Sequence, residues 1–306
     1  WQQLTEGDLR VETDLQYVHV DQHDIIFLDS DTLYFLNDGG IYRCDEFTKD
    51  TPNIYNIGLN YNTTQFYSLA VYPHTDDNWV MGGTQDNGTQ ASTLDGIGEY
   101  RRVSRADGSF CAIDFNNPDY LYSTTQFRRV FRTYKDQVDT ITNPNLVNDN
   151  TRFVNPLIMD ATDPNIIYQA SNVGVWALPN ARTAAENDWK RICRPFGVVT
   201  ALATTKIAPN TVYFGRINTP FRIENSSQTD GFYTPIPMDR NEDLPTGGYL
   251  ISLVPDDLDK EHMVAIYSNY DIESVWQTKD AYASDPTWVS CEGNLPNIPV
   301  RWGCFE

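Results

Sequence analysis

The chain has 306 residues, of which 22 are basic and 42 are acidic, so its formal charge at neutral pH is −20. This charge repels phosphate backbones and anionic membrane surfaces, and we therefore expect no nucleic-acid partner. The sequence contains no run of 18 apolar residues, so we also expect no direct insertion into a membrane.

The first repeat of the chain predicts an inner strand over residues 17–27, followed by strands over 32–36 and 40–43. The string Asn37-Asp38-Gly39 between the last two is a signal for a tight hairpin. The second repeat predicts strands over residues 66–72 and 79–83, and its turn follows from Gln85 to Gly88. Later inner strands are expected at 110–114, 153–160, 199–203 and 250–254, each followed by a turn rich in Pro, Asp and Asn.

A short apolar pair recurs on the second strand of each repeat. The pairs are Leu33-Tyr34, Val80-Met81, Leu121-Tyr122, Ile167-Tyr168, Val212-Tyr213 and Met263-Val264. Subtracting residue numbers, their second members lie 47, 41, 46, 45 and 51 residues apart. A four-stranded sheet of a β-propeller repeats at this spacing. The sequence therefore predicts an all-β chain that forms a single β-propeller domain over residues 1–306, with six recognisable four-stranded blades.

Helical periodicity is absent except at residues 181–188, where an Ala-rich string permits about two turns. Burial of one sheet face against the next would stabilise the propeller, and large aromatic residues would fill the space between sheets. The residues expected in that role are Trp176, Trp189, Trp276 and Trp288.

The five cysteines lie in different repeats and include no C-x-x-C pair. This spacing argues against a zinc site and against a dense disulfide framework. An odd number leaves at least one thiol free or paired with another chain. We expect single buried thiols that act as small apolar side chains.

The two ends of the sequence indicate a ring that is not closed. Trp1 resembles the closing strand of a preceding blade, and residues 295–301 resemble the start of a seventh inner strand. An open seam exposes sheet faces and a strand edge, which natural proteins avoid. We therefore expect part of a further blade, a fragment of a longer polypeptide, and a ring of seven or eight blades completed by missing residues or another chain.

Five strings of the sequence resemble a known class of propeller. They are His19-x-Asp21-x-His23, NDGGIYR at 37–43, QFY at 65–67, GGTQDNGT at 82–89 and NLPNIPV at 294–300. Together they resemble the sortilin-type and xyloglucanase-type propellers built from Asp-box (BNR) repeats. They are most similar to large secreted Bacteroidetes proteins with a type IX sorting domain. The resemblance implies a secreted or cell-surface location and a protein or polysaccharide ligand. The Asp-box pattern S-x-D-x-G-x-x-W itself survives only as remnants, such as Thr278 with Asp280 and Trp288.

Asp38 is the one candidate for a catalytic residue. In the xyloglucan-hydrolysing relatives a carboxylate sits in the string T-D-x-G-G-x-Y-R, and a second carboxylate faces it for acid/base cleavage. Here Asp38 directly precedes Gly39-Gly40, one residue shorter than that pattern. Asp38 is therefore expected to cap its turn, with glycoside hydrolysis as the alternative.

His19, Asp21 and His23 alternate along the first predicted inner strand, which would place all three on one face, in or beside the central channel. They are candidates for a structural metal ion, although neighbours on one strand rarely surround an ion without help from other strands. We favour no cofactor and a hydrogen-bonded cluster that binds ligand. Its expected members are His19, Asp21, His23, Asn37, Asp38, Gln85, Asp86 and Asn87.

Three functions remain open at this point. The preferred one is a secreted or cell-surface, non-catalytic propeller that serves as the binding or scaffold domain of a larger protein. The first alternative is a glycoside hydrolase that acts on β-glucan or xyloglucan. The second alternative is a sortilin-like receptor that binds a peptide in its channel by adding a strand to a blade.

Overall fold

The computed structural model describes residues 5–7, 16–58, 61, 64–74, 78–93, 100–146, 152–194, 197–226 and 232–306. The chain divides into two compact units. Unit 1 comprises Trp1–Gln65 with Thr84–Asn87, and unit 2 comprises Phe66–Gly83 with Gly88–Glu306. The single domain over residues 1–306 stays a prediction.

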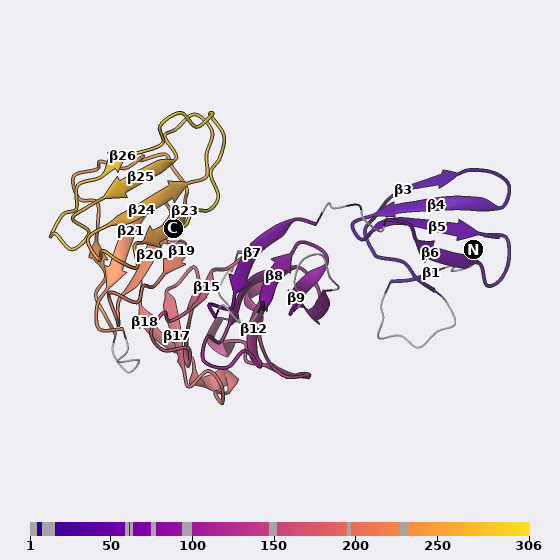
Figure 1. Cartoon of the computed structure of the whole chain (residues 1–306), viewed down its shortest axis with the longest axis horizontal. Helices are drawn as coiled ribbons and strands as arrows, with labels where there is room; N and C mark the ends of the chain where they lie inside the picture. The colour runs from indigo at the N-terminus through magenta and orange to yellow at the C-terminus, as the bar shows by residue number, and fades with distance from the viewer. Residues whose placement is uncertain are drawn as a thin grey trace. The chain divides into compact units, whose positions relative to one another are not determined.

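The described residues form six four-stranded antiparallel sheets, each a meander in which consecutive strands pair, and one two-stranded sheet (Figure 1). We call the four-stranded sheets blades 1 to 6 in chain order. Blade 1 contains β3 (Gln22–Phe27), β4 (Thr32–Asn37), β5 (Gly40–Asp45) and β6 (Asn53–Asn56). The two-stranded sheet pairs β1 (Thr5–Glu6) in parallel with β2 (Gln16–Tyr17).

Blades 2 to 6 follow one another through the rest of the chain. Blade 2 contains β7 (Phe66–Val71), β8 (Val80–Thr84), β9 (Gly88–Ser92) and β10 (Arg101–Ser104). Blade 3 contains β11 (Gly108–Ile113), β12 (Tyr120–Thr125), β13 (Val130–Tyr134) and β14 (Gln137–Thr140). Blade 4 contains β15 (Leu157–Met159), β16 (Ile166–Ala170), β17 (Val175–Pro179) and β18 (Lys190–Cys193). Blade 5 contains β19 (Val199–Ala203), β20 (Val212–Arg216), β21 (Thr219–Ile223) and β22 (Ile236–Pro237). Blade 6 contains β23 (Leu250–Pro255), β24 (Met263–Tyr267), β25 (Val275–Thr278) and β26 (Val289–Ser290).

These blades confirm the predicted all-β propeller architecture. Each of the six recurring pairs lies on the second strand of its blade, from Leu33-Tyr34 on β4 to Met263-Val264 on β24. Their burial explains the repeat: Tyr122, Tyr168 and Tyr213 are completely buried. Helix among the described residues is limited to three 3₁₀ turns, Gln126–Arg128, Pro144–Leu146 and Glu186–Asp188. None of these turns is long and apolar enough to cross a membrane.

Three predicted strands differ from the structure. The inner strand expected over residues 153–160 is limited to the three residues of β15. The expected inner strand over residues 17–27 is interrupted, because Asp21 adopts a left-handed φ of 60° and β3 starts only at Gln22. Residues 295–301, expected to begin a seventh inner strand, form no strand. Pro296 and Pro299 explain this, since proline has no N–H group to donate to a strand ladder.

The cores of unit 2 lie between successive blades, as expected for a propeller. One cluster joins blades 3 and 4 around Trp176 and Trp189, and another joins blades 5 and 6 around Trp288. Trp276 packs against the second cluster and is half-buried. These four residues therefore fill the space between sheets, as predicted.

Aspartates end two of the inner strands in the same way. Asp114 follows β11, and its Oδ1 accepts the backbone N–H groups of Asn116 and Asn117 at 2.9 and 3.0 Å. Asp160 follows β15 and accepts those of Thr162 and Asp163 at 2.8 and 3.1 Å. Such Asx turns explain why the sequence is rich in Asp and Asn directly after the predicted strands.

All five cysteines are free, but only Cys44, Cys111 and Cys193 are buried. Burial raises the pKa of the Cys111 and Cys193 thiols to about 11, so both stay protonated and behave as small apolar side chains. Cys291 and Cys304 are exposed, which differs from the expectation of buried thiols.

Candidate functional site

Unit 1 contains a polar pocket with a volume of about 570 Å³. Two turns form most of its wall: the β4–β5 hairpin turn around Asp38, and the turn at residues 84–87. The lining residues are His23, Leu36, Asn37, Asp38, Gly39, Gly40, Ile41, Gly58, Tyr61, Thr64, Gln65, Gln85, Asp86 and Asn87. The pocket thus gathers six of the eight residues that the sequence suggested for binding, from segments far apart in the chain.

The hairpin turn is shaped by its own residues. Asn37 pairs with Gly40 at the end of the β4–β5 ladder, and the Asn37 side-chain oxygen accepts the N–H of Gly39 at 3.0 Å. Gly40 has a φ of +118°, which an L side chain rarely adopts. The local sequence therefore turns tightly enough to project Asp38 from the tip of the hairpin.

Hydrogen bonds fasten the second turn to the first. The side-chain amide of Asn87 donates to the carbonyl oxygen of Asp38 at 3.1 Å. The Nε2 of His19 donates to the carbonyl oxygen of Asp86 at 3.0 Å. The N–H of Gln85 donates to the carbonyl oxygen of Gln65 at 3.0 Å. All three bonds end on backbone carbonyl oxygens, so the two turns are held together through the main chain.

His19 does not line the pocket, but it packs behind one of the residues that do, Gly39. Its side chain is buried, and a Cβ added at Gly39 would lie 2.5 Å from the Cβ of His19, so the ring packs directly against this glycine. Its Nδ1 faces the carbonyl oxygen of Val20 at 2.9 Å, while its Nε2 faces Asp86. His19 therefore links the segment before β3 to the turn at residues 84–87.

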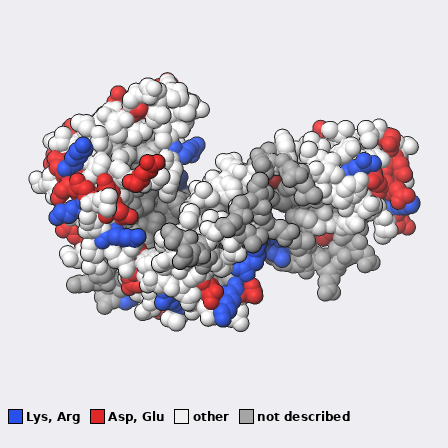
Figure 2. Space-filling view, in the orientation of Figure 1, with Lys and Arg blue, Asp and Glu red and all other residues white. Residues whose placement is uncertain are grey.

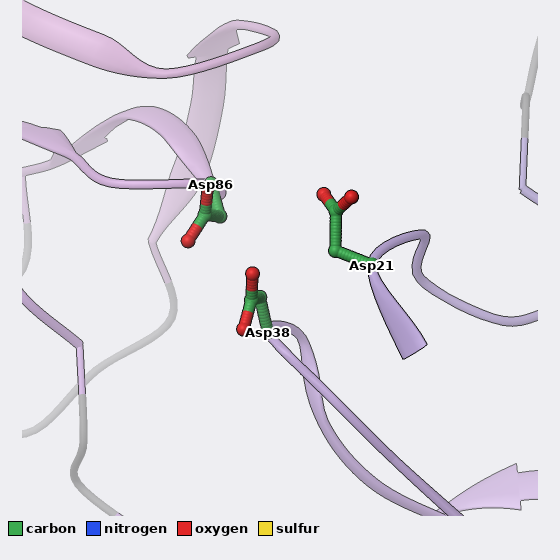
Figure 3. A group of neighbouring side chains, drawn as sticks. All are labelled: Asp21, Asp38 and Asp86. Atoms are coloured by element: carbon green, nitrogen blue, oxygen red, sulfur yellow. The ribbon is translucent and has the colours of Figure 1, made fainter. Parts of the chain in front are cut away.

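Three carboxylates converge beside the pocket. Side-chain oxygens of Asp21, Asp38 and Asp86 all lie within 4.8 Å of one another (Figure 3). Asp21 is exposed, and Asp38 and Asp86 are half-buried. Asp21 and Asp86 each hold a φ of 60°, a left-handed conformation that aspartate tolerates better than most residues. An oxygen-only donor set of this kind suits hard cations such as Ca²⁺.

His23 forms an ion pair with this group: its Nε2 donates a hydrogen bond to Oδ1 of Asp38. That hydrogen bond and the charge of Asp38, followed by the charges of Asp21 and Asp86, raise the pKa of His23 above its ordinary value, while partial desolvation lowers it. The imidazolium form therefore offsets part of the negative charge at the pocket.

The structure corrects the predicted geometry of the three residues His19, Asp21 and His23. Because Asp21 is left-handed and the β3–β4 register shifts between Gln22 and Asp24, the expected alternation on one strand face is broken. His19 points to a carbonyl, and His23 engages Asp38. The carboxylate group brings Asp21 together with Asp38 and Asp86, and His19 and His23 are not among its members. That these residues face a central channel, and that they bind ligand, stay predictions.

Sequence reasoning did not identify several pocket residues, among them Tyr61 and Thr64. Tyr61 is 66% exposed, so its ring is accessible to a ligand at the pocket. Its position in a polar stretch without periodicity gave no local signal, because only the path of the chain after β6 brings it to the hairpin.

The comparisons with known proteins support the fold. No protein-family model matches the sequence, and no curated protein matches it. The structure is similar to the β-propeller domain of Cps50 (Swd1) from Myceliophteria thermophila, with a TM-score of 0.56 and 12% identity over 85% of this chain and 82% of that one. It is also similar to YCF48 from Cyanidioschyzon merolae, with a TM-score of 0.51 and 13% identity over 88% of this chain and 84% of that one. The fold is thus a β-propeller, while the Asp-box type and a Bacteroidetes origin stay predictions.

Proposed function

We propose that the chain is a non-catalytic propeller that serves as the binding or scaffold domain of a larger secreted or cell-surface protein. The observation that carries this proposal is the pocket of unit 1, where the joined turns present Asp38, Asp86 and Tyr61. Carboxylates and an exposed aromatic ring suit a ligand that carries hydroxyl or cationic groups on an extended surface. A polysaccharide or a basic segment of a protein has this chemistry.

The position of Asp38 supports a binding role over acid catalysis. A general acid must direct its proton at the ligand, but the carboxylate of Asp38 is engaged by a hydrogen bond from the imidazole of His23. Figure 2 shows both acidic and basic side chains on the face in view, with mainly acidic ones grouped at its right end. Propellers present such sites without any common chemistry, so the pocket and not the fold defines the function.

The test is to titrate the protein with soluble xyloglucan, a mixed-linkage β-glucan and a basic peptide, and to assay the same mixtures for new reducing ends. We expect binding of at least one of them without release of reducing ends. Asp38→Asn and Asp86→Asn should weaken that binding about tenfold each, because each removes a charged acceptor. Asp31→Asn, at the opposite end of the β3–β4 hairpin, is the matched control. Absence of binding to all three ligands would overturn the proposal.

The secreted or cell-surface location has its own test. The protein should be found in the culture medium or be removed from intact cells by an added protease. Recovery in the cytosolic fraction alone would contradict this part of the proposal.

A glycoside hydrolase is the second candidate, and the carboxylate group favours it. Retaining glycosidases place two carboxyl groups about 5 to 5.5 Å apart, and Asp21 and Asp86 both face Asp38 within a comparable distance. In that case Asp38 would act as the nucleophile. Release of reducing ends that disappears in Asp38→Asn would establish the hydrolase and refute the non-catalytic role.

A further inference from the structure

A second cavity lies entirely in unit 2 and has a volume of about 700 Å³. Its walls are the first strands of three successive blades, β7, β11 and β15, which are neighbours in space. Residues from the loops after these strands line one end, and Trp302 from the C-terminal segment contributes to the lining. A volume in this range is typical of sites for small organic ligands.

The side walls of this cavity are apolar. Leu69 on β7 is 67% exposed, and Phe110 on β11 and Ile158 on β15 complete the wall together with Trp302, which is 60% exposed. Large apolar side chains that are open to water on an inner strand cost free energy unless something covers them. The wall therefore favours a ligand with an apolar body.

The end of the cavity that the loops line is polar and includes a basic side chain, Lys206. Lys206 and His74 lie in loops that follow inner strands and belong to the lining. Asp160 also lies there, but its carboxylate already accepts the N–H groups of two turn residues and the hydroxyl groups of Thr162 and Tyr168, at 2.7 to 3.2 Å. Its charge is therefore largely satisfied within the protein.

The two basic side chains at this end, Lys206 and His74, can each form a further hydrogen bond. Within the described part of the chain, no ion pair engages the ammonium group of Lys206, although Asp257 accepts its backbone N–H at 3.3 Å. The Nε2 of His74 donates to the carbonyl oxygen of Phe115 at 2.9 Å, which leaves Nδ1 for another partner. The chain as a whole has a net charge of −20 and repels anions. The ammonium group of Lys206 makes this cavity a place where an anionic group of a ligand can bind.

We propose that this cavity binds an amphipathic organic carboxylate. The apolar body of the ligand lies against Leu69, Phe110 and Ile158, and its carboxylate contacts Lys206 at the polar end. Trp302 covers the apolar body. This site is separate from the pocket of unit 1 and does not depend on the function proposed for that pocket.

Dodecanoate is a suitable probe, used below its critical micelle concentration. It has the required apolar length and one carboxylate. We expect saturable binding by calorimetry and a matching change in tryptophan fluorescence. Dodecanol, which lacks the charge, and dodecyltrimethylammonium, which reverses it, should bind at least about tenfold more weakly, as expected for loss of a charge-assisted contact. Equal binding of all three compounds would overturn the proposal, and so would no binding of dodecanoate.

Two substitutions locate the site. Leu69→Glu places a charge on the apolar wall at an exposed position that tolerates it, and it should abolish dodecanoate binding. Lys206→Gln should weaken dodecanoate about fivefold to tenfold but leave dodecanol unchanged. Lys135→Gln, in the exposed turn between β13 and β14, is the matched control and should bind as the unchanged protein does. If Leu69→Glu binds dodecanoate normally while its thermal unfolding is unchanged, the ligand lies elsewhere and the assignment is wrong.

Trp302→Phe tests the cover over the ligand. It should remove most of the fluorescence response to dodecanoate and weaken binding only slightly, because the smaller ring still covers part of the apolar body. A fluorescence response that persists in Trp302→Phe would contradict the assigned position of the ligand.

Discussion

The indole N–H of Trp189 donates a hydrogen bond of 2.7 Å to the carbonyl oxygen of Ile141, 48 residues earlier in the chain. Trp189 directly precedes the last strand of blade 4, and Ile141 directly follows the last strand of blade 3. Trp288 repeats the arrangement between blades 6 and 5, where its indole donates to the carbonyl oxygen of Met238 at 2.6 Å. Two blade interfaces are thus joined by the same tryptophan contact, which combines burial with a directed hydrogen bond.

Trp189→Phe should destabilise unit 2 by about 2 kcal/mol or more, because it leaves the Ile141 carbonyl without its donor and opens space in a buried cluster. Trp288→Phe should have a similar effect at its own interface. Urea unfolding followed by circular dichroism measures both. Trp302→Phe is the control, since this ring is 60% exposed. Equal unfolding midpoints for Trp189→Phe and Trp302→Phe would contradict the structural role of the contact.

The sequence predicted the blades because their signal is local. One recurring signal is a buried tyrosine on the second strand of a blade, as at Tyr122, Tyr168 and Tyr213. The other is an aspartate directly after β11 or β15 that accepts a backbone N–H group of the following turn. The turn bonds join residues two or three positions apart, and the tyrosines, although buried between blades, recur at the spacing of the repeat. The break at Asp21 was not predicted, because a left-handed aspartate leaves no distinct pattern in the sequence.

The pocket of unit 1 was predicted only as a set of residues. The bonds that build it join Asn87 to Asp38 across 49 residues and His19 to Asp86 across 67. Such distant pairs leave no periodic pattern in the sequence. The resemblance to known propellers indicated which residues to consider, but it did not indicate which of them are in contact. The convergence of Asp21 with Asp38 and Asp86 depends on two left-handed backbone positions and was therefore hidden.

Arg182 is a further place where neighbouring blades are joined. Its guanidinium donates two hydrogen bonds, of 2.6 and 2.8 Å, to the fully buried carboxylate of Asp114. Arg182→Met should destabilise unit 2 by about 3 kcal/mol, since removal of one partner leaves a buried charge unpaired. Thermal unfolding by calorimetry measures the loss.

A double variant separates this charge effect from a simple loss of packing. Asp114→Asn combined with Arg182→Met should recover much of the stability, because Asn still accepts the N–H groups of the following turn but carries no charge. Arg101→Met provides the comparison, since its partner Asp136 is 92% exposed and such pairs contribute little. Similar losses for Arg182→Met and Arg101→Met would contradict the prediction.

His23 should titrate above its ordinary pKa of about 6.5, because the Asp38 hydrogen bond and the surrounding carboxylates favour imidazolium. Proton and carbon shifts of the ring, followed by NMR as a function of pH, measure this pKa. Asp38→Asn should lower it toward the ordinary value. Asp31→Asn should leave it unchanged, since the length of β4 separates the two sites by roughly 17 Å.

The raised pKa also sets the direction of a stability change. A group whose pKa is higher in the folded state contributes its stabilisation fully below its unfolded pKa and loses it as the pH rises through its folded pKa. The difference in stability between the unchanged protein and His23→Gln should therefore shrink from pH 6 toward higher pH. A difference that grows over this range would show that the ion pair does not act as described.

Four glycines allow backbone conformation and close packing to be tested separately. Gly88 has a φ of +75°, and a Cβ there would also overlap the carbonyl oxygen of Ser104. Gly83 has no such φ, but a Cβ would overlap the carbonyl oxygen of Ser109 on β11, so this position is restricted by close approach and not by backbone conformation. Gly293 has a φ of +65° with no atom within 4 Å of an added Cβ, and Gly247 has open space without a positive φ.

The expected order of thermal stability follows from these contacts. Gly247→Ala should leave the unfolding temperature unchanged, and Gly293→Ala should destabilise by about 1 kcal/mol through strain alone. Gly83→Ala should destabilise by about 1 to 3 kcal/mol, because the backbone of β11 must move. Gly88→Val, which combines strain with overlap, should cost about 1 kcal/mol or more and exceed Gly293→Ala. If Gly83→Ala unfolds at the same temperature as Gly247→Ala, then β8 and β11 do not approach as closely as the structure places them.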